Sequence, residues 1–562
     1  MNRLFALFAL SLLSLFWLLC ASQGFPPGGP EDKSLPYIIR AFPPADSTNM
    51  PRDTRIVIEF SEAVNPISCQ EVIFITPFPG ENIRYKWKQD RQLTMTFADS
   101  LLRDRTYVIT IGAGVRDRRN NTMKNSFTLA FSTGAILDQG RVSGHVYGEQ
   151  IEGTQIWAYD LADTTTPNPM TNFPLYITQA GKDGLYQLTN LALSDYRLFA
   201  VLDRDVNNIY NAEFDRIGIP SQDVSLDSMD FMVGNFNFRT ALQDTTRPMV
   251  SAAAAPDDRH VDIRFTESML PDCLSVVRNY TVTSQGGLLA VLDAGIDFHN
   301  PAVVHLTTAP QDSGALYTLT LEKGYDLNWL ALRSDSVVFH GSAIPDTARP
   351  TYIGMQPPDS SKFLPSFTPL HMHFSKAMSP ESVARHLIVA DTLGDTITGK
   401  VSWPHLSHYV FNPTKEFASE RFYYITLPVD SVFDLSANPL ADTLFQRQFI
   451  SVNPDTLTAI SGIVADADTA ASGSFFLRAR SVGEKSETSF ERWVSQPGPY
   501  QIDGMLPGSY VIEFYRDEDE NGRFSSGSIV PFQPAERFCI YPDTITIRAR
   551  WPNEGEDLLL SR

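Results

Sequence analysis

Two segments far apart in this chain carry the same spacing of prolines and aromatic residues. The first runs from Pro36 to Pro66 (PYIIRAFPPADSTNMPRDTRIVIEFSEAVNP) and the second from Pro350 to Pro380 (PTYIGMQPPDSSKFLPSFTPLHMHFSKAMSP). In both, a Pro-Pro pair, a later proline and a Phe-Ser step stand in identical register. An internal repeat of this kind predicts an array of similar units in place of one large core.

A third, shorter copy begins at Pro248 and reaches RFTESMLP, in which Phe265 corresponds to Phe60 and Phe374. The downstream ends of the three copies also agree: YVITIGAGVRD, YTLTLEKGYD and YYITLPVDSVFD. Each reads as a strand, because apolar residues alternate with a period of two and a polar loop follows. Three units of roughly 100 residues with short strands and turn signals between them predict β-sandwiches.

A different unit occurs twice. YQLTNLALSDYRLFAVLDRDVNNIY begins at Tyr186 and YQIDGMLPGSYVIEFYRDEDENGRF begins at Tyr500, and matching positions stand at a constant offset of 314 residues. VSGHVYG (142–148) and ISGIVAD (460–466) supply a matching first strand upstream. The chain therefore contains three copies of the first kind of β unit and two of the second, in the order first, second, first, first, second.

The FSEAVNP and FSKAMSP motifs resemble the bacterial Ig-like domain of envelope proteins, the SbsA-like Ig family. The second unit, with its PGSY corner, resembles the transthyretin-like or carboxypeptidase-regulatory-like β-sandwich of exported proteins. These resemblances imply an all-β fold of tandem β-sandwich domains, three Ig-like and two transthyretin-like, after a signal peptide. The expected domains are Ig-like at 37–135, 246–342 and 346–453, and transthyretin-like at 138–243 and 456–562.

The N-terminus holds a strongly apolar segment. Behind Arg3, residues 4–19 are apolar apart from two serines, which predicts a secretory signal peptide at 1–19 because a membrane span needs about 20 such residues. LFWLLCAS resembles a lipobox, so Cys20 is the expected lipidation site and 20–36 a Pro/Gly-rich tether. The alternative is ordinary signal cleavage near Ser22. The arrangement resembles that of Bacteroidota envelope lipoproteins and implies an exported protein, anchored by its lipid in the cell envelope at the outer membrane.

The chain is acidic. Its 562 residues carry a net charge of −20, which argues against nucleic acid as a partner because the phosphates would be repelled. Cys69, Cys273 and Cys539 are far apart and fall in different expected domains, so no disulfide framework is predicted.

Two loops place acidic and amide side chains at alternate positions. They are Asp203, Asp205 and Asn207 in one copy, and Asp517, Asp519 and Asn521 in the other. Oxygen ligands at this spacing suit calcium, but neither loop has the acid that an EF-hand needs at position 12. Two interpretations stay open: a structural calcium site, or a turn closed by Asx hydrogen bonds.

Residues that could carry catalysis do not form a known pattern. His371 and His373 alternate on one expected strand and could bind zinc, although a packed pair is the favoured interpretation. Glu62 and Glu267 correspond to Lys376 in the third copy and read as solvated strand ends. The sequence lacks the common catalytic motifs, which predicts a non-enzymatic scaffold or spacer. The alternative is a surface adhesin that binds a glycan or an envelope protein through loops or through tryptophans, of which Trp87, Trp157, Trp329 and Trp551 are the candidates.

Overall fold

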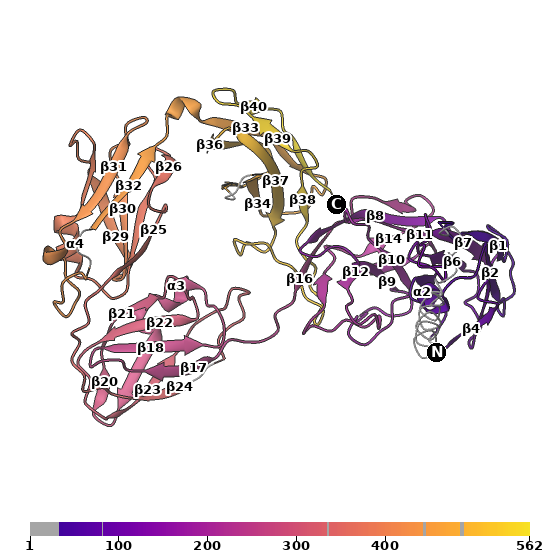
Figure 1. Ribbon diagram of the computed structural model, residues 1–562, viewed down its shortest axis with the longest axis horizontal. Helices are drawn as coiled ribbons and strands as arrows, with labels where there is room; N and C mark the ends of the chain where they lie inside the picture. The colour runs from indigo at the N-terminus through magenta and orange to yellow at the C-terminus, as the bar shows by residue number, and fades with distance from the viewer. Residues whose placement is uncertain (1–32, 81, 334–335, 442–444, 484–487, 562) are drawn as a thin grey trace, which may run out of the picture. The chain divides into compact units, whose positions relative to one another are not determined.

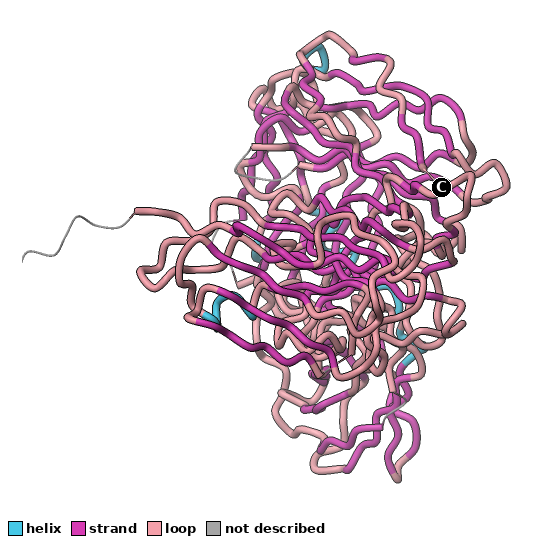
Figure 2. Tube along the Cα trace, turned by 90° about the vertical axis from the view of Figure 1, so that its right-hand side faces the viewer, coloured by secondary structure: helices cyan, strands magenta, loops and turns pink. Residues whose placement is uncertain are grey.

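The computed structural model describes residues 33–561, except residue 81 and residues 334–335, 442–444 and 484–487. The chain divides into two compact units, one holding most of the chain up to Thr240 and the other most of the chain from Ala241. Strands dominate the described residues and the helices are short, as Figure 2 shows. The predicted all-β class of tandem β-sandwiches is confirmed. The expected signal peptide, Cys20 and residues 21–32 lie outside the described residues.

In the first unit, the first Ig-like copy consists of two sheets around one core. One sheet has the order β1-β2-β5-β4 and the other β3-β6-β7. The bounds are β1 Ile38–Phe42, β2 Ile56–Phe60, β3 Ile73–Thr76, β4 Ile83–Lys88, β5 Gln92–Phe97, β6 Thr106–Ile111 and β7 Phe127–Ser132.

In the second compact unit, two further Ig-like copies repeat this topology (Figure 1). The middle copy has the sheets β17-β18-β22-β21 and β20-β19-β23-β24, and the third copy has β25-β27-β30-β29 and β26-β32-β31-β28. The middle strands are β17 Val250–Ala254, β18 His260–Phe265, β19 Tyr280–Ser284, β20 Gly287–Leu289, β21 Val291–Ile296, β22 Val303–Thr308, β23 Leu316–Leu321 and β24 Ser336–His340. The third copy's are β25 Tyr352–Gln356, β26 Ser361–Leu364, β27 Leu370–Phe374, β28 Ile388–Asp391, β29 Gly399–His405, β30 His408–Pro413, β31 Phe422–Leu427 and β32 Phe445–Ser451.

The proline that ends each FSEAVNP-type motif begins a short helix. The helices are α2 Pro66–Gln70, α3 Pro271–Leu274 and α4 Pro380–His386. Proline suits the first helical position because its missing N–H would have no partner there. In the first copy Asn65 caps α2 by accepting hydrogen bonds from the N–H groups of Ile67 and Ser68. The repeated proline is thus a helix start.

Each Ig-like core is built on the strand that precedes this helix. In β2 the side chains of Ile56, Ile58 and Phe60 are fully buried, and the corresponding strands β18 and β27 bury the same three positions. Burial of one such side chain stabilises the fold by roughly 1.5–3 kcal/mol. The period-two alternation seen in the sequence therefore fixes which face of each sheet turns inward.

The second kind of unit also has the same strand pairing in both copies. Strand β8 pairs with β11, β15 and β16, and β12 pairs with β9, β13 and β14, all in one nine-stranded sheet. In the other copy β33 pairs with β36, β40 and β41, and β37 pairs with β34, β38 and β39. The bounds are β8 Gly140–Gly148, β9 Gln155–Asp160, β10 Tyr176–Gln179, β11 Leu185–Leu191, β12 Asp195–Leu202, β13 Arg216–Gly218, β14 Val224–Ser225, β15 Met232–Val233, β16 Phe238–Leu242, β33 Thr458–Asp466, β34 Ser474–Ser481, β35 Ser489–Val494, β36 Gly498–Met505, β37 Gly508–Asp517, β38 Phe538–Ile540, β39 Ile545–Ile547, β40 Asn553–Glu554 and β41 Leu558–Leu560.

The repeated tyrosines of these two copies lie in the cores with their hydroxyls bonded. Tyr196 donates to the carbonyl of Ala192 and Tyr510 to that of Leu506, each at 2.9 Å. A buried hydroxyl requires such a partner, which explains why tyrosine occupies both positions. The transthyretin-like identity of these copies stays a prediction.

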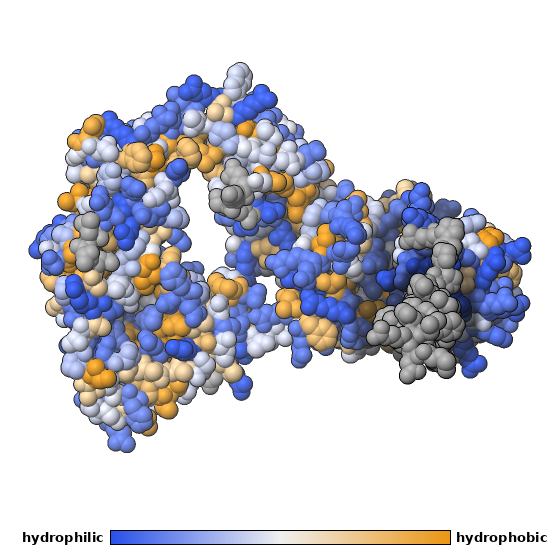
Figure 3. Space-filling view, viewed as in Figure 1, coloured by the Kyte–Doolittle hydropathy of each residue, from blue (hydrophilic) through white to orange (hydrophobic). Residues whose placement is uncertain are grey.

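Among the described residues, no helix combines the length and the apolar character that a membrane crossing requires. On the face that Figure 3 shows, apolar residues lie in small patches scattered among hydrophilic ones.

Candidate functional sites

The acidic loop after β37 is closed by its own carboxylates. Asp517 is buried, and its Oδ1 and Oδ2 accept the N–H groups of Asn521 at 3.0 Å and Gly522 at 2.9 Å. Asp519 accepts hydrogen bonds from the Asn521 side chain at 2.8 Å and from the Ser525 hydroxyl at 2.7 Å. Hydrogen bonds at these distances hold a strand-to-loop turn in one conformation.

The loop after β12 has the same construction. Asp203 accepts the N–H groups of Asn207 at 3.3 Å and Asn208 at 2.8 Å, and the Asn207 side chain donates to Asp205 at 2.8 Å. Asn208 and Gly522 occupy the same position and both have positive φ, at 58° and 77°. The two stretches are one structural element used twice. Whether this element binds calcium stays a prediction.

A third carboxylate joins the loop after β37. One ligand oxygen each from Asp517, Asp519 and Glu536 lie within 4.8 Å of one another. Glu536 accepts the N–H groups of Glu518 and Ser525, both at 2.9 Å. Burial, with a further contribution from the charges of Asp519 and Asp517, raises the pKa of Glu536 to about 7. Sequence reasoning missed this residue because it stands outside the register in which the two copies match.

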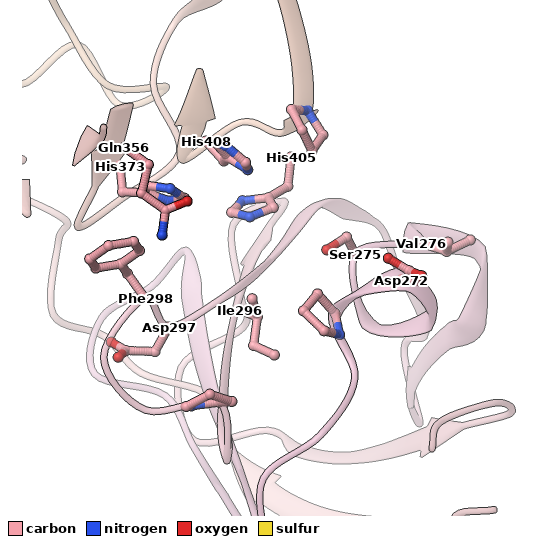
Figure 4. Close-up of a pocket in the computed structure, with 13 residues that line it drawn as sticks. Asp272, Ser275, Val276, Ile296, Asp297, Phe298, Gln356, His373, His405 and His408 are labelled. Carbon is pink, nitrogen blue, oxygen red and sulfur yellow. The ribbon is translucent and has the colours of Figure 1, made fainter. Parts of the chain in front are cut away.

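Three histidines of the third copy line a cavity of about 610 Å³, namely His373, His405 and His408 (Figure 4). His371 and His373 lie on β27, and His371 Nδ1 is 3.0 Å from Nε2 of His408 on β30. The His373 ring stacks on that of His408 at 4.1 Å and meets Phe298 on its other side at 4.3 Å. Packed rings thus form one part of the lining, and Asp272, Ser275, Asp297 and Gln356 contribute polar groups to it.

The pKa values of these imidazoles are lowered from the usual range. Burial, assisted by repulsion between the neighbouring rings, lowers the pKa of His373 to about 3 and that of His408 to about 4. Within the described chain, the groups of three ligand atoms that converge as a metal requires do not include these histidines. The packed pair is the interpretation that the geometry favours over a zinc site.

The strand-end charges of the Ig-like copies are only partly solvated, since Glu62, Glu267 and Lys376 are all half-buried. The Lys376 side chain is only 12% exposed, and its Nζ forms salt bridges with Asp346 and with Asp434, the latter at 3.0 Å. At the corresponding position of the middle copy, burial and then the charges of Asp244 and Asp326 raise the pKa of Glu267 to about 7.

The candidate tryptophans divide into two groups. Trp157 is fully buried, and Trp87 packs against the first core with its ring 6.1 Å from that of Phe60. Trp329 and Trp551 are exposed, at 42% and 75%. Core packing therefore accounts for the first two, and only the other pair has the exposure that a binding platform needs.

The three described cysteines form no disulfides. Cys69 lies in the first Ig-like core, where burial raises the pKa of its thiol to about 12. A thiol held in this protonated state is a small core residue without nucleophilic character.

Residues 32–133 and 346–449 match the family described as the bacterial Ig-like domain. They contain the first and third copies of the repeat, which carry the most complete FSEAVNP-type motif. A search of curated proteins found no match.

Similarity to solved structures is weak along the whole chain. The N-terminal part of the bacterial S-layer protein SbsC is 12% identical, with a TM-score of 0.17, and the match covers 36% of this chain and 44% of that one. Domains 1–6 of SbsC are 11% identical over 92% of this chain and 68% of that one, with a TM-score of 0.16. The LD transpeptidase LdtMt1 in complex with imipenem is 8% identical over 38% and 91% of the two chains, with a TM-score of 0.17.

Proposed function

We propose that this protein is an exported, lipid-anchored envelope protein whose β-sandwiches serve as a non-enzymatic scaffold or spacer. The apolar segment ending at Cys20 and the bacterial Ig-like description of two segments support this proposal.

The observation that carries it is which residues the copies share. In all three Ig-like copies an aspartate holds the same loop: Asp117, Asp326 and Asp434 each accept the N–H groups two and four residues later. The buried positions of the core strands recur as well. By contrast, the histidines of β27 have no counterpart in β2 or β18. The copies therefore share the residues that stabilise a β-sandwich. This suits a protein that serves as a long and rigid spacer.

The anchor is tested by changing the predicted lipidation site. The wild-type chain is expected to incorporate labelled fatty acid and to sediment with membranes, whereas Cys20→Ser does neither and Ser22→Ala behaves as wild type. Equal sedimentation and equal labelling of the wild type and Cys20→Ser would refute the lipid anchor.

The exposed Trp551 favours a second function, a surface adhesin that binds a glycan or protein partner through an aromatic face. Trp551→Ala would then reduce binding of the purified chain to cells or to immobilised glycans, with unchanged far-ultraviolet circular dichroism. Binding that is absent from both proteins would leave the spacer function as the explanation.

A further inference from the structure

The third Ig-like copy contains a buried cation between two acids. Asp346 stands four residues before the first proline of the repeat, and Asp434 holds the loop after β31. The ammonium of Lys376 lies between them and bonds both carboxylates, and it also donates to the carbonyl of Ala348 at 2.8 Å. Although burial alone would raise it, the pKa of Asp346 is held below its usual value by hydrogen bonds from Lys376 and Ser436.

The middle copy has the same two acids without the cation. The segments DTTRP and DTARP align Asp244 with Asp346, and the loops align Asp326 with Asp434. The position of Lys376 is taken by Glu267. One carboxylate oxygen each from Asp244, Glu267 and Asp326 lie within 4.8 Å of one another. The middle copy thus has a third acid at the place where the third copy has a lysine.

Asp326 points to a ligand independently of this comparison. The residue is 1% exposed, and its Oδ1 accepts the N–H groups of Asn328 and Leu330, both at 2.8 Å. Its Oδ2 is buried and has no hydrogen-bond partner in the part of the chain that the structure describes. A buried carboxylate oxygen without a partner is strongly unfavourable unless something compensates for its lost hydration.

The other two copies show what normally fills this role. The second oxygen of Asp117 accepts from the Asn121 side chain at 2.8 Å, and that of Asp434 accepts from Asn438 at 3.0 Å in addition to Lys376. In the middle copy the asparagine position holds Leu330, which cannot donate from its side chain. The oxygen in the middle copy therefore lacks both the asparagine that the first and third copies share and the lysine of the third copy.

We propose that Asp244, Glu267 and Asp326 bind a hard divalent cation of the calcium class. Carboxylate oxygens that each lie about 2.3–2.6 Å from one calcium ion are at most about 5 Å apart, and the observed grouping satisfies this limit. An all-oxygen set of three carboxylates favours calcium over zinc or copper, which prefer nitrogen and sulfur. The Asn328 side chain donates to Asp244 Oδ2 at 3.1 Å and so helps to hold that carboxylate in place.

The proposed ion does in the middle copy what the ammonium of Lys376 does in the third. It joins the segment that leads into the sandwich, which carries Asp244, to the ends of two strands of that sandwich. This role is independent of the lipid anchor and of the two acidic loops after β12 and β37.

The test gives each copy the residue of the other at this position, in the full chain. Calcium titration calorimetry is expected to show about one ion fewer per chain for Glu267→Lys than for the wild type, because the lysine supplies the cation itself. Its melting temperature in chelator is expected to exceed that of the wild type. The converse variant, Lys376→Glu, is expected to gain about one ion.

Glu267→Gln serves as the second variant, since it keeps the shape of the side chain and removes its charge. It is expected to lose the same ion, and a parallel titration with magnesium separates the two hard cations by their demands on geometry. Equal calcium uptake by the wild type, Glu267→Gln and Glu267→Lys would overturn the proposal. Glu267 would then share a proton with Asp244.

Discussion

Aspartates that accept backbone N–H groups are the residues on which the loops of this protein depend. Asp326 and Asp434 each accept two N–H groups across a residue with positive φ, namely Trp329 at 64° and Ala437 at 66°. A residue other than glycine in this region costs about 1–2 kcal/mol. The two hydrogen bonds of each aspartate offset this cost, so the aspartate is required even though the loop residues vary.

Asp466 offers a test of charge pairing at this scale. It forms salt bridges with Arg516 at 2.7 Å and with Arg537 at 2.6 Å. Burial would raise its pKa, but the hydrogen bonds from Arg537 and Arg516 outweigh burial and lower it. The pair therefore contributes stability that is complete above the unfolded pKa of about 3.9 and is lost as the pH falls through the lower folded value.

Asp466→Asn is expected to destabilise the chain by roughly 3–5 kcal/mol at pH 7, because the buried guanidinium of Arg516 loses its carboxylate partner and that of Arg537 keeps only Glu518. Thermal unfolding from pH 2 to 7 should show that the wild type loses its advantage over the variant only at the acidic end. Asp455→Asn is the control, since its exposed pair with Arg550 is worth about 0–1 kcal/mol. A difference between Asp466→Asn and wild type that is unchanged down to pH 2 would contradict this assignment.

At the scale of elements, a glycine in each copy of the second kind of repeat lets another segment cross close to its strand. A Cβ at Gly144 in β8 would lie 2.0 Å from the carbonyl oxygen of Phe236, and one at Gly462 in β33 would lie 2.2 Å from that of Glu556. These distances are far below van der Waals contact, and both obstacles are backbone atoms. The glycine that the two SG motifs share is thus explained by the segment crossing over it.

Gly144→Ala is expected to destabilise the sandwich by about 1–3 kcal/mol, because the added methyl forces the crossing segment away. Chemical denaturation of the full chain measures this change. Gly234→Ala is the matched control in the same sandwich, since its Cβ would meet only the Ser143 hydroxyl at 4.0 Å. Similar stabilities of the two variants would show that the close approach is not required.

The acidic loops are tested as a pair. If they bind calcium, the wild type takes up about two more ions than the combined variant Asp203→Asn, Asp205→Asn, Asp517→Asn and Asp519→Asn, and calcium raises its melting temperature. Asparagine keeps an acceptor for the turn and removes the charge. Asp183→Asn is the control, because Asp183 lies in an exposed turn and its Oδ1 likewise accepts a backbone N–H, that of Leu185. Equal heats of titration in all three proteins would assign the loops as turns only.

The sequence predicted these elements where two copies could be compared in register. Asp203 and Asp517 were found because six positions around them match without insertion, and the structure gives both the same hydrogen bonds. Glu536 and the group around Asp326 were not found, because their members come together only through the pairing of distant strands. The sequence shows that Lys376 corresponds to Glu267. The consequence of this difference depends on Asp346 and Asp434, which the structure places beside Lys376.

At the scale of the whole molecule, the chain consists of repeated domains, each with a hydrophobic core of its own. Separate clusters of buried hydrophobic residues occur within the described parts of residues 56–131, 142–238, 261–339, 355–449 and 460–560. The domain boundaries themselves stay a prediction. A chain with separate cores resists load domain by domain, which is the property that a spacer needs.

Pulling single molecules of the full chain from its two ends tests the scaffold function most directly. Independent sandwiches of roughly 100 residues should give five separate unfolding steps, each lengthening the chain by about 300–350 Å, because an extended residue spans about 3.3–3.6 Å. Calcium should raise the unfolding force of those domains that bind it. A single cooperative step, or extension without any resisting step, would contradict the view of this protein as a tandem load-bearing scaffold.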